Sequence, residues 1–196
     1  MANRSYLYTT DDYTATGADF KATGLSEYPY GISYVYQLLV SYDTKSIKSK
    51  IFDEQEETAI VGDFEKGKQM VIDYLKMVRA LALDYMDEGF EDFVDETIAF
   101  LNARTAKYVL LENYEIYSLD DDSLADQQEE FIALAQQDRE AIEKILEAYK
   151  KGNLTEDSLD DEASDYLNMM EDDDVEDFWT DVLYYDLSGE GGDGEE

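Results

Sequence analysis

Residues 58–85 read TAIVGDFEKGKQMVIDYLKMVRALALDY, and within this stretch the pattern of apolar residues changes from that of a strand to that of a helix. Its first four residues are apolar or β-branched and are followed by Gly62, which is typical of a short buried strand. From Phe64 onward, apolar residues recur every three or four positions, and this spacing predicts an amphipathic helix. Asp63 stands between the two and is a residue type that favours the N-cap. The stretch therefore predicts a strand that leads directly into a core helix.

The segments on either side extend this pattern into an α+β fold that is rich in helix. Runs of β-branched and aromatic residues predict strands, and apolar stripes of helical period predict helices. The predicted strands are residues 4–9, 58–62 and 107–117, and the predicted helices are residues 64–86, 90–104 and 124–151. Residues 32–40 fit either structure, and the spacing of their apolar side chains favours a helix. The sequence thus predicts a small β-sheet packed on helices, followed by an acidic C-terminal region.

The C-terminal region has a composition of its own. Residues 155–165 form a predicted acidic linker, and residues 174–185 are predicted to form a short aromatic helix that docks on the body. The docking face of that helix consists of Phe178, Trp179, Val182 and Leu183. Residues 188–196 combine glycines with acids, which is typical of a disordered tail. We therefore expect one α+β domain over residues 1–187 and an acidic tail.

The composition removes several kinds of chemistry. The sequence contains no histidine and no cysteine, so the usual metal ligands, thiolate nucleophiles and disulfides are missing. It also contains no glycine-rich phosphate loop and no G-x-S-x-G elbow. Glu112 and Glu115 are three residues apart on a predicted strand, so they would point to opposite faces and make a poor catalytic pair. We expect a protein that is no enzyme and has no cofactor and no specific metal site.

The start of the chain differs from a secretory signal. Asp11 and Asp12 stand where a signal peptide would have an apolar run, and no segment approaches the ~20 apolar residues that cross a bilayer. We expect a cytoplasmic protein without a membrane segment.

The net charge of −34 is concentrated in the second half of the chain. Residues 111–196 carry four basic and thirty acidic side chains, whereas residues 1–50 carry five of each. Such a field disfavours direct contact with nucleic acid or an anionic membrane and attracts a basic protein. The simpler interpretation is that the charge only keeps the protein soluble. The predicted partner-binding residues are Asp120, Asp121, Asp122, Asp160, Asp161, Glu162, Glu171, Asp172, Asp173, Asp174, Trp179, Tyr184 and Tyr185.

Three segments, MANRSYLY at residues 1–8, GLSEYPY at residues 24–30 and FWTDVLYY at residues 178–185, resemble a family of uncharacterised bacterial proteins. The resemblance covers both ends of the chain and implies no established activity. In its small size and acidity the chain is also similar to toxin-neutralising immunity proteins. We therefore expect a non-catalytic inhibitor or immunity-type protein that neutralises a basic partner. Mimicry of nucleic acid is one way in which it would do so. A regulatory domain or a carboxylate-dependent enzyme is the alternative.

Overall fold

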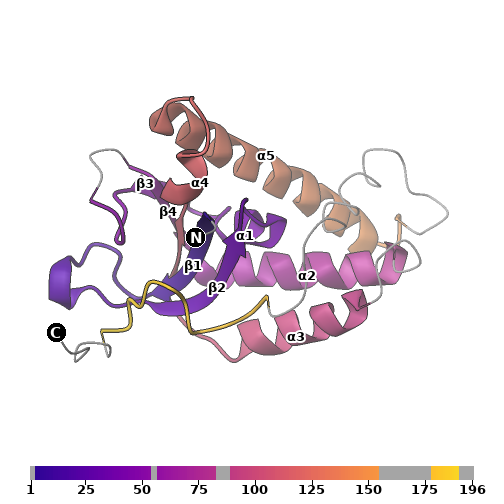
Figure 1. Ribbon diagram of the computed structural model, residues 1–196. Coiled ribbons are helices and arrows are strands. Elements are labelled where there is room, and N and C mark those ends of the chain that lie inside the picture. Colours follow the sequence, from indigo (N-terminus) through magenta and orange to yellow (C-terminus); the bar gives the residue numbers. More distant parts are fainter. Residues whose placement is uncertain (1–2, 54–56, 83–88, 155–177, 190–196) are drawn as a thin grey trace.

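An antiparallel β-sheet forms the centre of the fold in the computed structural model, which describes residues 3–53, 57–82, 89–154 and 178–189 (Figure 1). Within these residues the sheet has five strands in the order β2-β1-β5-β4-β3. The strands are β1 (Arg4–Thr10), β2 (Thr23–Pro29), β3 (Lys45–Ile47), β4 (Ala59–Asp63) and β5 (Tyr108–Glu112). Each neighbouring pair is antiparallel. The predicted α+β class is confirmed.

Helices follow or connect the strands along the chain. They are α1 (Tyr34–Leu39), α2 (Phe64–Ala82), α3 (Phe90–Asn102), α4 (Tyr114–Tyr117) and α5 (Leu124–Lys150). The start of α2 follows the sequence pattern, because the Asp63 carboxylate accepts a hydrogen bond from the backbone N–H of Lys66 at 3.0 Å. Gly67 allows α2 to pack closely on α1, since a Cβ atom at this position would lie 1.9 Å from the backbone oxygen of Leu39.

The two faces of the sheet are covered differently. Side chains such as Leu7, Ile60 and Leu111 point into the main core, which α1, α2, α3 and α5 complete. The opposite face carries Tyr6, Tyr8, Ala59 and Leu110 in a smaller apolar cluster. That cluster is closed by loop residues and by the last described segment of the chain, which contributes Leu183 and Tyr185.

Residues 178–189, here called the C-terminal strap, run antiparallel along the outer side of β2. The backbone N–H of Thr180 donates to the oxygen of Leu25 at 2.9 Å, and the N–H of Ala22 donates to the oxygen of Leu187 at 2.9 Å. At Gly24 there is no room for a side chain, because a Cβ atom would lie 2.8 Å from both the Asp181 oxygen and Leu183 Cγ. In Figure 1 the strap is the yellow segment beside β2.

The structure corrects the sequence predictions at three places. The predicted strand 107–117 ends at Glu112 and continues as α4. Residues 178–185 of the predicted helix 174–185 are extended and turn-like instead of helical, because they lie along β2 and cover the sheet. Of the four predicted docking residues, Phe178 and Leu183 are buried, Trp179 is partly buried and Val182 is exposed. The third place is the two edges of the sheet, because β2 and β3 were not among the predicted strands.

Parts of the C-terminal prediction fall outside the described residues. These are the acidic linker 155–165, residues 174–177 of the predicted helix and residues 190–196 of the predicted tail. In the part of the chain that the structure describes, no helix is both long and apolar enough to cross a membrane.

Candidate functional site

The carboxylate of Glu115 joins three distant segments of the chain. Its Oε2 accepts hydrogen bonds from the backbone N–H of Arg4 at 2.9 Å and from the Tyr6 hydroxyl at 3.1 Å. Its Oε1 accepts a hydrogen bond from the Tyr185 hydroxyl at 3.3 Å. Glu115 belongs to α4, whereas Arg4 and Tyr6 belong to β1 and Tyr185 to the strap. One side chain therefore holds the first strand, α4 and the strap together.

The two tyrosines that bind Glu115 act as neutral donors. Burial, followed by the negative charge of Glu115, raises the pKa of both the Tyr6 and the Tyr185 hydroxyl above the usual value for tyrosine. Both hydroxyls therefore keep their protons near pH 7 and can donate to the carboxylate. Tyr6 and Tyr185 also pack edge to face, with ring centroids 5.2 Å apart.

Tyr184 and Tyr185 have different roles although they are adjacent. Tyr185 is partly buried and anchors the strap, whereas Tyr184 is 58% exposed and packs edge-on against the Tyr185 ring at 4.9 Å. The backbone N–H of Tyr184 donates to Oε2 of Glu27 at 3.0 Å. Oε1 of Glu27 lies 3.4 Å from Nε of Arg4. Tyr184 is therefore held beside an ion pair with its own ring in solvent.

An exposed group of acids begins a few residues after Glu115. We call it the acidic patch, and it consists of Asp120, Asp121, Asp122, Asp126, Glu129 and Glu130. No Lys or Arg occurs between Lys107 and Arg139. No ion pair within the described residues reaches these six carboxylates. Leu119, next to the patch, is an exposed apolar residue. The patch thus presents uncompensated charge beside an apolar side chain.

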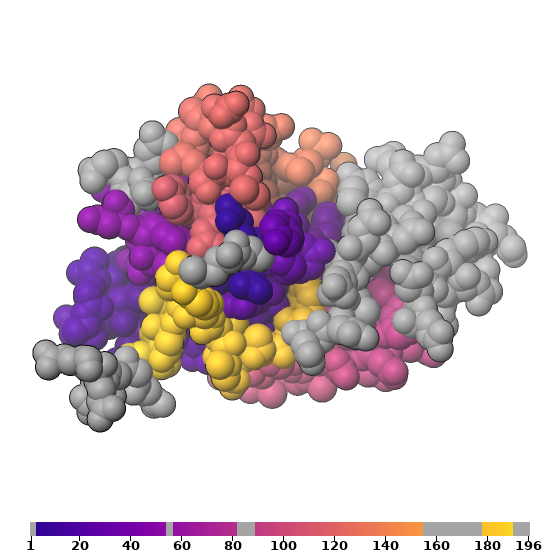
Figure 2. Space-filling view, viewed as in Figure 1, coloured from indigo at the N-terminus to yellow at the C-terminus, as the bar shows by residue number. Residues whose placement is uncertain are grey.

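The local sequence explains why the acidic patch is stable. Ser123 is the N-cap of α5, and its hydroxyl accepts a hydrogen bond from the backbone N–H of Asp126 at 3.1 Å. The patch surrounds this helix start, where the positive end of the helix dipole favours negative side chains. Figure 2 shows the segment that contains α4 and the start of α5 (salmon) and the strap (yellow) on the same face of the molecule.

The structure does not bring every predicted residue to this surface. The Trp179 indole donates to the Thr97 hydroxyl at 2.8 Å and stacks on Phe100 with centroids 4.9 Å apart, so it packs the strap against α3. Asp120, Asp121 and Asp122 are exposed as expected, and Tyr184 and Tyr185 adjoin Glu115 and Glu27. The remaining predicted residues lie outside the described part of the chain, namely Asp160, Asp161, Glu162, Glu171, Asp172, Asp173 and Asp174.

Sequence reasoning missed the two carboxylates that organise the site. Glu27 lies in a segment for which no strand was predicted, and Glu115 was expected to point away from Glu112 along one strand. The strand instead ends at Glu112, and α4 returns Glu115 to Tyr6, whose Cα pairs with that of Glu112. Glu27 and Glu115 therefore lie on the strap side of the sheet, since Glu27 pairs with Tyr6 between β2 and β1. Long-range strand pairing produces this arrangement, and no local sequence signal reports it.

A hollow of about 930 Å³ beside the strap is a second acidic region. Its lining includes one lysine, Lys21, and five aspartates: Asp11, Asp12, Asp19, Asp181 and Asp186. Hydrogen bonds from Thr14 lower the pKa of Asp12, and hydrogen bonds from Ser188 lower the pKa of Asp186. Both carboxylates therefore stay ionised at mildly acidic pH, and the hollow would attract a cation.

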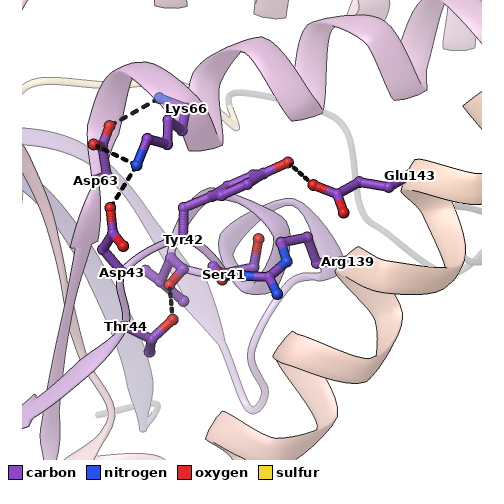
Figure 3. A network of polar contacts seen from close by, with 9 residues as sticks. Ser41, Tyr42, Asp43, Thr44, Asp63, Lys66, Arg139 and Glu143 are labelled. Carbon is purple, nitrogen blue, oxygen red and sulfur yellow. Dashed lines mark hydrogen bonds and ion pairs between the residues drawn. The ribbon is translucent and has the colours of Figure 1, made fainter.

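Charges between α2 and α5 are arranged in the opposite way, because they compensate one another (Figure 3). Lys66 Nζ lies 2.6 Å from Asp43 Oδ2 and 3.5 Å from Asp63 Oδ2. The Tyr42 hydroxyl, between Lys66 and α5, donates to Glu143 at 2.5 Å. A hollow of about 460 Å³ beside this network is lined by three lysines and three acids. The lining of this hollow therefore carries no excess charge.

Comparison with known proteins assigns the chain to a family. A family model described as a domain of unknown function, DUF7822, matches residues 12–152. The chain belongs to the DUF7822 family. The matched residues of this DUF7822 protein contain Glu27, Glu115 and the acidic patch, whereas Arg4, Tyr6 and the strap lie outside the match. No curated protein and no solved structure matches the chain.

Proposed function

We propose that this DUF7822 protein is a non-catalytic, cytoplasmic binding protein that neutralises a basic protein partner, as a bacterial inhibitor or immunity-type protein does. The observation that carries this proposal is the contact between Glu115 and Tyr185. It joins the strap, which carries the exposed Tyr184, to α4, which the acidic patch follows in the chain, and Figure 2 shows these two segments on one face. Tyrosines at the centre of an interface and unpaired charges around them are the features that favour binding of a basic protein.

Charge supports this role in two ways. The net charge of −34 would steer a basic partner toward the molecule and raise the association rate. Exposed carboxylates ~6 Å apart in water repel each other by only about 0.7 kcal/mol, so the patch is tolerated while no partner is bound. The same field would repel nucleic acid and anionic membranes, so direct contact with either is disfavoured.

Mimicry of nucleic acid is the form of inhibition that the start of α5 favours. Asp126 is three residues from Glu129 and four residues from Glu130 on one helix, so the Asp126 side chain lies ~5–6 Å from each of the two glutamates. Neighbouring phosphates of one nucleic-acid strand, which rise 3.4 Å per base pair along the axis, likewise present negative charges a few ångströms apart. The partner would then be a protein whose own function is to bind nucleic acid.

The proposal is tested by a pull-down from the native host with three forms of the full chain. The first is wild type, and the second has the substitutions Asp120→Asn, Asp121→Asn and Asp122→Asn. The third neutralises three exposed acids of α3 by Glu91→Gln, Asp92→Asn and Glu96→Gln, and it matches the second in charge. Thermal unfolding of all three forms checks that each is folded.

We expect wild type and the α3 variant to retain one basic protein at low salt and to lose it at about 0.5 M salt, because exposed charges are screened. The patch variant should retain much less of it, and calorimetry with the purified protein should reproduce the difference. Equal retention by the two variants, or retention that survives high salt unchanged, would show that the patch is only a solubilising surface.

A further inference from the structure

Tyr30 is an exposed tyrosine in a backbone conformation that tyrosine rarely adopts. Its φ angle is 59°, in the left-handed region where glycine is at ease and a bulky side chain is strained. The residue is nevertheless 73% exposed, so packing of its ring does not explain the conformation. The backbone holds it there, because the Tyr30 N–H donates to the oxygen of Asn3 at 2.8 Å. Strain that keeps a large ring in solvent points to a use for the ring.

A short series of contacts connects Tyr30 to Tyr184. Asn3, which accepts the Tyr30 N–H, is followed by Arg4, and Arg4 Nε lies 3.4 Å from Glu27 Oε1. The other oxygen of Glu27 accepts the N–H of Tyr184 at 3.0 Å. Tyr30 is therefore linked through its backbone to the residue next to Arg4, and Tyr184 is linked through its backbone N–H to Glu27.

We infer that Tyr30, Tyr184 and Glu27 form a binding site for an arginine side chain of the partner, and that Arg4 holds this site in the unbound protein. The inference rests on the proposed function, because it says where and how the basic partner is recognised. A guanidinium group is planar, pairs with carboxylates and stacks on aromatic rings. Glu27 would supply the carboxylate, and the exposed rings of Tyr30 and Tyr184 would supply the faces for stacking.

The way in which Arg4 binds Glu27 leaves room for exchange. Nε of Arg4 lies 3.4 Å from Oε1 of Glu27, which is longer than the ~2.7–2.9 Å of strong guanidinium–carboxylate hydrogen bonds. Both side chains are partly exposed, with 32% of Arg4 and 22% of Glu27 accessible, so water can reach and screen the pair. A partner's arginine that approaches with two N–H groups toward Glu27 would compete well with Arg4.

Calorimetric titration of the full chain at low salt tests the inference. The probe is an arginine-rich peptide of about ten residues, long enough to reach from this site into the neighbouring surface. A lysine peptide of equal length and charge is the comparison. We expect tighter binding of the arginine peptide, because lysine cannot stack as a planar group.

Four variants assign the binding to this site. Arg4→Ala should bind the arginine peptide about threefold or more tightly, because Glu27 loses its own cation. Arg79→Ala is its control, since Arg79 is also paired with an acid, Asp95, and is 30% exposed. Tyr30→Gly and Tyr184→Ala should each weaken binding about threefold, the loss expected for one exposed cation–π contact. Tyr30→Gly should unfold at the same or a higher temperature, because glycine adopts this φ angle without strain.

The results separate this inference from the proposed function. Equal affinities of Arg4→Ala and Arg79→Ala, equal binding of both peptides, or an unchanged affinity in Tyr30→Gly would overturn the arginine site. If binding is then lost only in the Asp120→Asn, Asp121→Asn, Asp122→Asn variant, the proposed function stands without it. If wild type binds neither peptide at low salt, both fail.

Discussion

The backbone N–H of Lys50 donates to Oε1 of Glu112 at 2.7 Å and thereby ties a surface loop to the centre of the sheet. Glu112 is fully buried, and its Oε2 has no hydrogen-bond partner within the described residues. Burial raises the pKa of this carboxyl to about 7, and the hydrogen bonds from Lys50 and Ser49 offset only part of the effect. A group in the middle of the fold thus changes its charge in the physiological range.

Glu112 should make stability depend on pH in the direction opposite to that of a salt-bridged acid. Its pKa rises on folding from 4.5 to about 7, so its contribution is complete below pH 4.5 and is lost as pH rises through about 7. Glu112→Gln keeps the acceptor for Lys50 and removes the charge. We expect it to be more stable than wild type at pH 8 by about 3 kcal/mol and similar at pH 4.5. Urea unfolding at several pH values measures this, with Glu91→Gln at an exposed position of α3 as control. Parallel stability curves would contradict the assignment.

The Tyr185 hydroxyl should stabilise the strap. Tyr185→Phe removes the hydrogen bond to Glu115 and keeps the ring, so we expect the free energy of unfolding to fall by about 1 kcal/mol. Amide hydrogen exchange should become faster within residues 178–189. Tyr184→Phe is the matched control, since its ring is exposed. The same loss in both variants would mean that the Glu115 contact is not the cause.

Gly67 should be intolerant of a substitution that helices normally favour. Propensity alone makes Gly→Ala in a helix stabilising by up to about 1 kcal/mol. At Gly67 the added Cβ would lie 1.9 Å from the Leu39 backbone oxygen, and α1 would have to move. We therefore expect Gly67→Ala to lower the free energy of unfolding by about 2 kcal/mol or more. Urea denaturation measures the change, and Lys76→Ala, at an exposed position of α2, should stay within about 0.5 kcal/mol.

Trp179 should report on docking of the strap, because it is the single tryptophan of the chain. Thr97→Ala removes the acceptor of its indole N–H, and we expect a loss of about 1 kcal/mol together with a red shift of the emission. Glu96→Ala, on the neighbouring exposed position of α3, should change neither. Emission that stays unchanged in Thr97→Ala would show that the indole is held by stacking on Phe100 alone.

Elements with strong local patterns could be predicted from the sequence. The stripe beginning at Phe64 became α2, and Ser123 starts α5 through the capping hydrogen bond that its side chain type favours. By contrast, β2 contains glycine, serine, glutamate and proline, which are weak strand formers, and only its pairing with β1 makes it a strand. Tertiary contacts therefore determine that β2 is a strand.

The candidate site could be predicted only in part for the same reason. Exposure of Asp120, Asp121 and Asp122 follows from their charge. The hydrogen bonds of Glu115 to Arg4 and Tyr6, however, span 111 and 109 residues of sequence. Helical spacing in residues 174–185 predicted a helix, whereas residues 178–185 are extended and turn-like along β2. Local periodicity carries no information about such distant partners.

The strap also has a consequence for how copies of this chain behave toward one another. A seven-residue outer strand with open backbone groups is a template on which another chain can add a strand, and the strap occupies that side of β2. Ending the polypeptide before Phe178 would uncover the template together with the tyrosines beneath it. Glu27 and Pro29 within β2, together with the high negative charge of the chain, would then oppose pairing of β2 with another chain.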